Sequence, residues 1–290
     1  MKLLENIFAI ALVALLAYVG IDFNAKKDVP VKPKTPTFSQ FMTCDIGENW
    51  SNRYAMVDEW NDIEVSGMSG ALGHRVYAGD DGANDGTVSW QLLWDSKQKA
   101  DAFWNNGPTD EFKAWADRHR SVMVCDGEGI RNYDVDFPRP ENKQGEWDGD
   151  GAFVSVVYQC NFTTNTEDGP VPMEDKEEGK RLMRALYGEF MDYVDKEDKD
   201  ASWHIWSTTG KRGPYSFGVY THNGENPEPF MDYDFYWMNY YESDAEANAR
   251  LGRWLETGAD LQAKFDEFST CEESLIYTNS AVLFPDLSDE

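Results

Sequence analysis

In the second half of the chain the hydrophobic period changes in a regular order, which predicts alternating strands and helices. Apolar and polar residues alternate over residues 155–162, as in a half-buried strand. From about residue 175 to residue 195 the apolar positions recur every three or four residues, which predicts one face of a long helix. Strand-like runs follow at residues 203–208, 215–222 and 234–241, the last of them aromatic on both faces.

A second helix and a closing strand complete this half. Ser243, with Glu246 three positions later, forms a capping box that predicts a helix start. The apolar face of this helix continues to Phe268, and residues 276–284 read as the last strand. The predicted order is β-α-β-β-α-β, with the runs at 203–208 and 215–222 counted as one bent or paired element.

The first half repeats this order with a shorter first helix. The expected elements are strands at 41–47, 74–78, 88–94 and 132–137, a brief helix at 52–61 and a longer helix after Ser96. The longer helix is interrupted at residues 105–108, and Thr109 or Asp110 can cap a new start. The second half weakens at the corresponding place, residues 257–260.

Landmark residues also recur in the same order, which identifies an internal duplication. Cys44, Tyr77, Ser96, Cys125 and Phe137-Pro138 are followed by Cys160, Tyr220, Ser243, Cys271 and Phe284-Pro285. Such self-similarity predicts two copies of one structural unit. We therefore expect a first ferredoxin-like repeat at residues 40–139, an inter-repeat linker at 140–153 and a second repeat at 154–286.

A β-α-β-β-α-β unit is a ferredoxin-like domain, and its antiparallel sheet carries helices on one face only. The other face needs cover, and two copies in one chain can cover each other. The predicted fold class is therefore α+β, with tandem ferredoxin-like repeats whose antiparallel sheets pack as an intrachain α/β barrel. A monomer that contains its own pseudo-dimer is the expected state.

Charge narrows the classes of partner. The chain has 26 basic and 53 acidic residues, a net charge of -27, which repels nucleic acid and anionic lipid. Calcium-like spacings at Asp81, Asp85 and Gly86, and again at residues 148–151, lack the acidic twelfth position, so turn chemistry explains them better. No metal site is predicted.

The first 25 residues read as a signal peptide or an N-terminal membrane anchor. Lys2 precedes an apolar run of about 15 residues, from Ile7 to Ile21, which is short for a bilayer span. The cleavage motif is weak, so an uncleaved anchor stays open. Residues 26–39, which contain three prolines, predict a semi-rigid linker. Secretion or a periplasmic location follows, with membrane contact only through this segment.

Four cysteines in an exported chain predict disulfides. They allow three pairings, and the duplication selects Cys44 with Cys125 and Cys160 with Cys271, because each bridge then closes the same loop in its own repeat.

The layout resembles a known group, the dimeric α/β-barrel superfamily and its antibiotic-biosynthesis-monooxygenase-like members. The segment that carries the resemblance is Trp94-Asp95-Ser96, then Phe103-Trp104, the break Gly107-Pro108 and Phe112 to Trp115. Residues 241–243, Ala247 and Leu251 echo it. The chain departs from the group by its tandem fusion, its export and its cysteines. The group has no shared catalytic motif, so the resemblance implies the fold and assigns no catalytic residue.

Two histidines are candidates for chemistry. His204 lies beside Trp203 and Trp206 in one aromatic run, and His222 ends the neighbouring strand, two positions after Tyr220. A histidine among aromatic residues inside a barrel is compatible with a general base or a haem ligand. A hydrogen-bonded core histidine is the simpler interpretation of both. No cofactor is assigned, and haem stays an alternative.

Aromatic residues on the strands suggest a ligand cleft between sheet and helices. The candidates for ligand contact are Tyr77, Trp90, Trp94, Trp206, Tyr220, Trp237 and Asn239. Asn239 shares a strand face with Trp237, and a polar group there needs a protein or ligand partner. Core packing alone explains most of the aromatic residues.

Three hypotheses for function remain. The first is binding of a small apolar or aromatic molecule. The second is a cofactor-independent oxygenase, isomerase or lyase like the superfamily. The third is an envelope-tethered interaction module without a small ligand.

Overall fold

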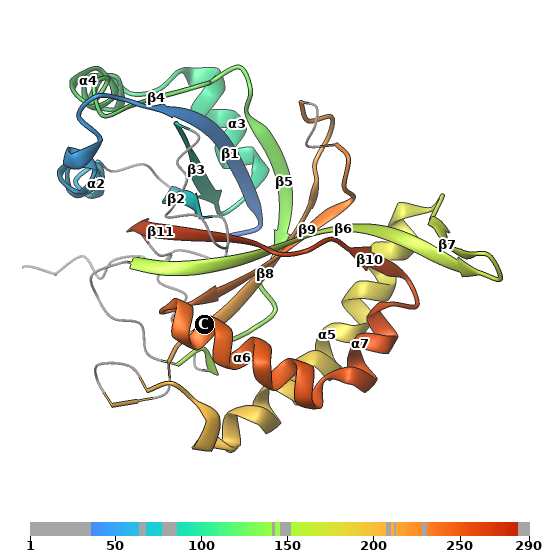
Figure 1. Ribbon diagram of the computed structural model, residues 1–290. Coiled ribbons are helices and arrows are strands. Elements are labelled where there is room, and N and C mark those ends of the chain that lie inside the picture. Colours follow the sequence, from blue (N-terminus) through green and yellow to red (C-terminus); the bar gives the residue numbers. More distant parts are fainter. Residues whose placement is uncertain are drawn as a thin grey trace, which may run out of the picture. The chain divides into compact units, whose positions relative to one another are not determined.

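The front half of the chain folds in the predicted order (Figure 1). Its elements are β1 (Phe38–Ile46), η1 (Trp50–Asn52), α2 (Arg53–Asn61), β2 (Met68–Val76), β3 (Thr87–Trp94), α3 (Lys97–Asn106), α4 (Asp110–Arg118), β4 (Met123–Cys125) and β5 (Arg131–Asp136). The interrupted helix is present, because Ser96 caps α3 and Thr109 caps α4, each through its side-chain oxygen. Gly107 ends α3 with a φ of 74°, which a glycine adopts without strain.

The rear half repeats the order with a longer first helix. Its elements are β6 (Ala152–Thr166), β7 (Gly169–Pro172), α5 (Lys176–Lys199), η3 (Ala201–Trp203), β8 (Tyr215–His222), β9 (Phe235–Tyr241), α6 (Asp244–Thr257), α7 (Ala259–Phe265), β10 (Ser269–Cys271) and β11 (Leu275–Leu283). Ser243 caps α6 by accepting from the backbone N–H of Glu246.

This computed structural model describes residues 36–63, 68–76, 86–140, 143–145, 152–206, 210–211, 213–227 and 231–283, without the side chains at 61, 69–76, 152 and 280–283. All of them belong to one compact unit, Pro33–Glu290. The predicted signal segment, Tyr77 and the turns at Asp81 and at residues 148–151 lie outside the described residues. Among the described helices, none is both long and apolar enough to cross a bilayer.

The prediction of a strand at residues 203–208 is wrong for residues 203–206, which are the residues of this range that the structure describes. Trp203 ends the 3-10 turn η3, which Asp200 caps by accepting from the backbone N–H of Ser202. The indole of Trp203 donates to the carbonyl of Glu197 at the end of α5, which holds this turn against the helix. The aromatic run therefore marks a packed turn after a helix, and β8 alone serves as the second strand of this half.

Each half builds a four-stranded antiparallel sheet of ferredoxin-like order. The front sheet runs β2-β3-β1-β5 and the rear sheet runs β11-β6-β9-β8. The sheets join at their edges, where β2 pairs with β11 and β5 pairs with β8. The pairing of β6 with β9 completes a closed ring of eight strands. The predicted intrachain α/β barrel is thereby confirmed, and the joints between its halves are backbone ladders.

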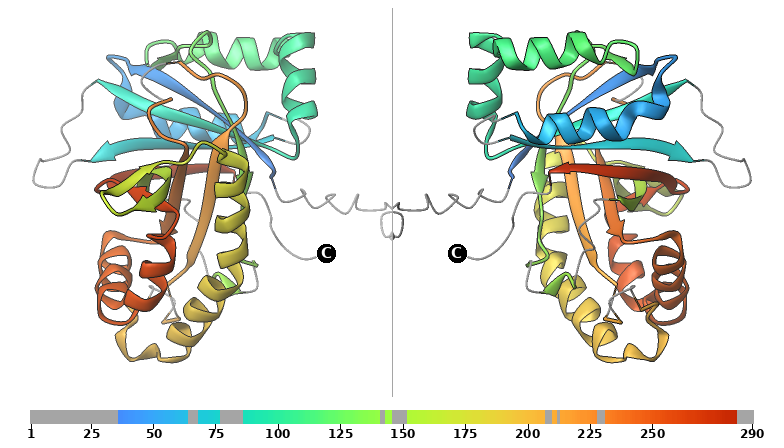
Figure 2. Two further views of the ribbon diagram at one scale, coloured as in Figure 1. Left: turned by 90° about the vertical axis from the view of Figure 1, so that its right-hand side faces the viewer. Right: turned by 90° about the vertical axis from the view of Figure 1, so that its left-hand side faces the viewer.

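Each strand of the barrel presents one face to the helices and one to the interior. In Figure 2 the front helices and the rear helices cover opposite parts of the ring. The helix-facing side chains form one core in each half, and a third cluster fills the barrel around Tyr133, Tyr220 and Tyr236. Tyr220 is fully buried and hydrogen-bonds Gln91 and Tyr240, and burial raises the pKa of its hydroxyl to about 12. Inside the barrel, the bare faces of the two sheets thus cover each other through side chains of both halves.

The packing of the barrel interior predicts opposite effects on the free energy of unfolding for two glycine-to-alanine substitutions. A Cβ at Gly218, on β8, would lie 2.8 Å from the ring of Phe137 and 2.9 Å from that of Tyr220. We expect Gly218→Ala to lower the free energy of unfolding by about 1–3 kcal/mol through overpacking. Gly252→Ala is the control, because the site on α6 is exposed and open. The free energy of unfolding of this variant, measured by urea denaturation, should rise by up to about 1 kcal/mol. A neutral Gly218→Ala would contradict the packed interior.

Candidate functional site

A cavity of about 650 Å³ lies in the rear half, between its sheet and its helices. The floor comes from β6 and β9, and the walls come from α5, α6 and α7. The place agrees with the cleft between sheet and helices expected from the sequence. Its size falls in the range of about 300–1,000 Å³ that is usual for small-molecule sites.

Aromatic rings contribute ten of the 32 described residues of the lining and are held by their neighbours. The lining includes Phe190, Tyr215, Trp237, Tyr241, Trp254 and Phe265. The indole of Trp237 stacks on Phe217, with ring centroids 4.8 Å apart and planes inclined by 4°. Phe190 and Phe265 meet the same indole edge-on at 5.2 and 5.6 Å. The wall is therefore fixed before any ligand enters.

Asn239, on β9, is a polar group of this floor. Its side-chain oxygen accepts from the Tyr215 hydroxyl at 3.0 Å and from the Trp237 indole N–H at 2.9 Å. The residue is 8% exposed and lines the cavity. Both predicted ligand contacts on β9, Trp237 and Asn239, thus border the cavity.

A buried cluster of charges borders the cavity through Arg250. Arg250, on α6, contacts Glu246 Oε1 with its Nε at 2.7 Å and Asp198 Oδ1 with its Nη1 at 3.1 Å. Arg139 contacts Asp198 from the other side, and its own side chain is fully buried. Burial lowers the pKa of the Arg139 guanidinium. Because each charge has an opposite partner, the cluster joins α5 and α6 to the segment between the halves.

His204 lies inside this charge cluster and does not line the cavity. Its Nε2 is 3.5 Å from Asp198 Oδ1 and its Nδ1 is 3.5 Å from Glu246 Oε1. Its ring stacks on Trp203 with centroids 4.1 Å apart. Both ring nitrogens therefore face carboxylates of the cluster.

His222 lies at the end of the barrel interior. Its Nε2 contacts the carbonyl of Tyr233 at 2.5 Å, and its Nδ1 is 2.7 Å from the amide nitrogen of Asn226. Its ring packs on Tyr133 at 5.2 Å. The two histidines thus have separate surroundings, and neither lies with Trp237 and Asn239.

The other candidates for ligand contact are dispersed. Trp90 and Trp94 are buried in the front core, where Trp90 packs against Trp60 at 4.9 Å. Tyr220 lies inside the barrel. Trp206 is 53% exposed on the surface beside the charge cluster. The spacing of aromatic residues in the sequence could not distinguish these environments, because each residue lies in a run that contains other aromatic residues.

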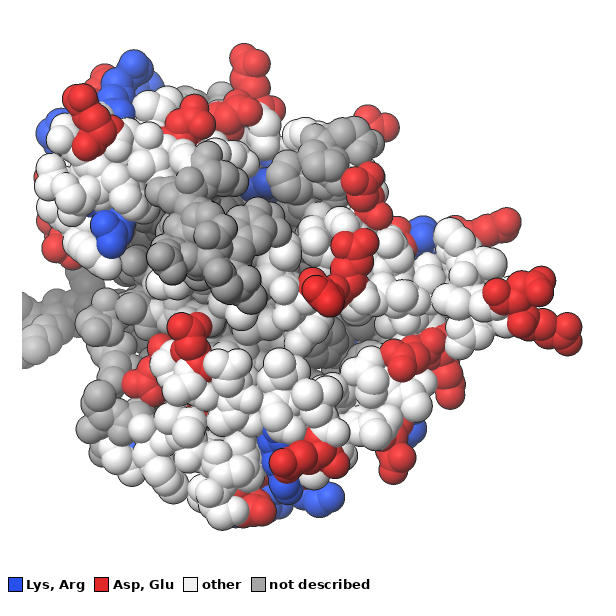
Figure 3. All heavy atoms as spheres, in the orientation of Figure 1, with Lys and Arg blue, Asp and Glu red and all other residues white. Residues whose placement is uncertain are grey.

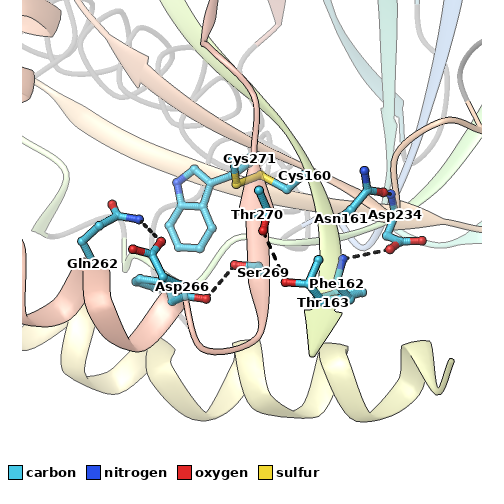
Figure 4. The surroundings of a disulfide bond; sticks show 12 residues. Cys160, Asn161, Phe162, Thr163, Asp234, Gln262, Asp266, Ser269, Thr270 and Cys271 are labelled. Carbon is cyan, nitrogen blue, oxygen red and sulfur yellow. Dashed lines mark hydrogen bonds between the residues drawn. A yellow bond between two sulfur atoms is a disulfide. The ribbon is translucent and has the colours of Figure 1, made fainter. Parts of the chain in front are cut away.

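Both disulfides pair as predicted, Cys44 with Cys125 and Cys160 with Cys271. The rear bridge borders the cavity and joins β6 to β10. Around it, the hydroxyl of Ser269 donates to the carbonyl of Phe265, and Gln262 donates to Asp266 (Figure 4). The bridges indicate folding in an oxidising compartment.

No known protein family and no curated protein matches the chain. Among solved structures, a proposed monooxygenase from Lactobacillus acidophilus is similar, with 11% identity and a TM-score of 0.46 over 86% of this chain and 95% of that one. An anthrone oxidase-like protein has 9% identity and a TM-score of 0.43, over 87% and 96%. A DypB variant of Rhodococcus jostii in complex with heme has 11% identity and a TM-score of 0.40, over 87% and 96%. The likeness is one of layout and says nothing about activity.

The described histidines do not fit a histidine-ligated haem. The ring nitrogens of His204 face carboxylates, and those of His222 contact Tyr233 and Asn226. His119 pairs with Glu59 on the surface, away from the cavity. No histidine is among the described residues that line the cavity.

Proposed function

We propose that the protein binds a small, uncharged, apolar or aromatic molecule in the rear cavity. The observation that carries this proposal is a cavity of about 650 Å³ whose aromatic walls are held rigid by stacking and edge contacts. A preformed apolar cavity gains from releasing its water when a flat apolar molecule enters.

Charge favours a neutral ligand. Acidic side chains are spread over the face in Figure 3, in keeping with the net charge of -27, so an anion is repelled on approach. The basic groups at the cavity are already paired, Arg250 with Asp198 and Glu246, and Arg253 with Glu197. No described cation in the lining is therefore left to neutralise an anionic ligand.

We further propose that the chain acts outside the cytoplasm, as a secreted or periplasmic monomer. The two disulfides support this location, and residues 1–25 would supply the signal or the anchor. Membrane contact would then be limited to that segment.

Filling the cavity is expected to block binding. Ala247, on α6, lines the cavity, and Ala247→Trp places an indole in the ligand's space. We expect this variant to weaken binding of the neutral fluorophore N-phenyl-1-naphthylamine at least tenfold in a fluorescence titration. Leu255→Trp is the matched control, because Leu255 lies on the same helix and is 74% exposed. Absence of wild-type binding, or equal binding by both variants, would refute the proposal.

A further inference from the structure

The side chain of Asn239 has a fixed orientation. The indole N–H of Trp237 can only donate, so the atom that it meets at 2.9 Å must be the amide oxygen. The hydroxyl of Tyr215 donates to the same oxygen at 3.0 Å. If the amide were flipped, its NH₂ group would face the indole N–H, and two donors would meet without an acceptor. The NH₂ group of Asn239 is therefore locked on the remaining side.

This NH₂ group donates to none of the described residues, although the side chain is more than nine-tenths buried. The amide nitrogen is not one of the fully buried polar atoms without a partner, so it is open to the cavity, and a ligand that lacks an acceptor would bury it at a cost of about 1–3 kcal/mol. The side chain borders the cavity, which is the space from which an acceptor can come.

The front half contains a comparable side-chain amide, on β1, with its donor satisfied. The side-chain oxygen of Gln40 accepts from the indoles of Trp94 and Trp104 at 2.9 and 2.8 Å. Its NH₂ group donates to Asn132 Oδ1 at 2.9 Å. A protein acceptor thus pairs the amide donor of Gln40, whereas the amide of Asn239 borders the cavity.

A second polar group lies next to Asn239 on the same face of β9. Tyr241 lines the cavity two positions later, and its hydroxyl makes no hydrogen bond with any described residue. Residues two apart on a strand are separated by about 6.5–7 Å. The floor therefore offers an amide donor and, beside it, a hydroxyl that can donate or accept.

We propose that Asn239 selects ligands that carry an uncharged acceptor oxygen, such as a carbonyl, on an aromatic ring system. This inference rests on the proposed function, because it assumes that the rear cavity is the binding site. The carbonyl oxygen accepts from the Asn239 NH₂ group while the ring lies among Trp237, Tyr215 and Phe265. A hydrocarbon of the same shape leaves the amide donor unpaired and binds less tightly.

The test uses two probes of matched shape that displace N-phenyl-1-naphthylamine. 2-Acetylnaphthalene carries a carbonyl, and 2-isopropenylnaphthalene has a CH₂ group in place of the oxygen. For the wild-type protein we expect the ketone to displace the fluorophore at a concentration about five- to tenfold lower, the worth of one hydrogen bond. At pH 8, Asn239→Asp keeps an oxygen for Trp237 and Tyr215 but presents a second oxygen in place of the NH₂ group. The preference should fall to one or reverse.

Asn248→Asp is the matched control, because Asn248 is an exposed residue of the cavity lining and the charge change is the same. It should keep the preference for the ketone. Asn239→Leu, which lacks any donor, is a second variant whose fold is checked by circular dichroism, and it too should lose the preference. Equal displacement by both probes in the wild type, with fluorophore binding still blocked by Ala247→Trp, would overturn this inference alone. Failure of the fluorophore to bind would overturn the proposed function and this inference with it.

Discussion

Glu246→Ala is expected to lower the free energy of unfolding by about 3–5 kcal/mol, as measured by urea denaturation. Glu246 is 1% exposed, and its Oε1 lies 2.7 Å from Arg250 Nε. Its Oε2 accepts from the backbone N–H of Ile205 at 3.2 Å. Removal of this carboxylate leaves a buried guanidinium with one partner fewer and removes the acceptor of the Ile205 backbone N–H, which is only partly buried.

Glu256→Ala is the control for this substitution. Glu256 lies on the same helix and contacts Arg253 at 3.4 Å, but its side chain is 70% exposed. A surface pair of this kind is worth about 0–1 kcal/mol, so the control should unfold nearly as the wild type does. If the free energy of unfolding of Glu246→Ala were also within about 0.5 kcal/mol of the wild-type value, the buried charge cluster would not hold the rear half together.

Removal of the rear disulfide is expected to lower the free energy of unfolding by nearly as much as Glu246→Ala. The double variant Cys160→Ala/Cys271→Ala opens a bridge between residues 111 positions apart. In the chain-entropy model such a bridge is worth on the order of 4–5 kcal/mol, and measured losses for natural disulfides are about 2–5 kcal/mol. Thermal and urea unfolding of the purified variant give the loss directly.

The front bridge provides the comparison. Cys44→Ala/Cys125→Ala opens a separation of 81 residues, so its loss of stability should be of similar size. Only the rear bridge borders the cavity. Under conditions where both variants stay folded, only the rear variant should bind N-phenyl-1-naphthylamine more weakly. Equal fluorophore affinity in both variants would show that the bridge does not shape the cavity.

The order of elements was predictable because local signals report it. Ser96, Thr109 and Ser243 cap helices where the sequence places them, since each side chain accepts from the backbone N–H three residues later. The pairing of the four cysteines followed from the duplication. The barrel could be predicted as well, since one-sided helix cover leaves a bare face on each sheet.

The joints of the barrel and the position of the cavity were not predictable. Pairing of β2 with β11 and of β5 with β8 depends on backbone groups, which any sequence possesses. The two halves have similar aromatic content, but Trp60 and Trp115 fill the space over the front sheet. The charge cluster around His204 draws on Arg139, Asp198 and Glu246, which are too far apart in sequence to show a spacing. The error at residues 203–208 arose because an aromatic run suits both a strand and a packed turn.

Closure of the eight-strand ring has a consequence for the protein at high concentration. Each strand of the ring has a hydrogen-bonded neighbour on both sides, so the ring presents no backbone edge to which a strand of another molecule could add. Edge-to-edge addition is the first step of many amyloid and domain-swapped assemblies. An aromatic-rich chain of this kind would otherwise be prone to that route. The continuous circle of backbone ladders leaves only the short strands β4, β7 and β10, each with a single partner, as edges among the described strands.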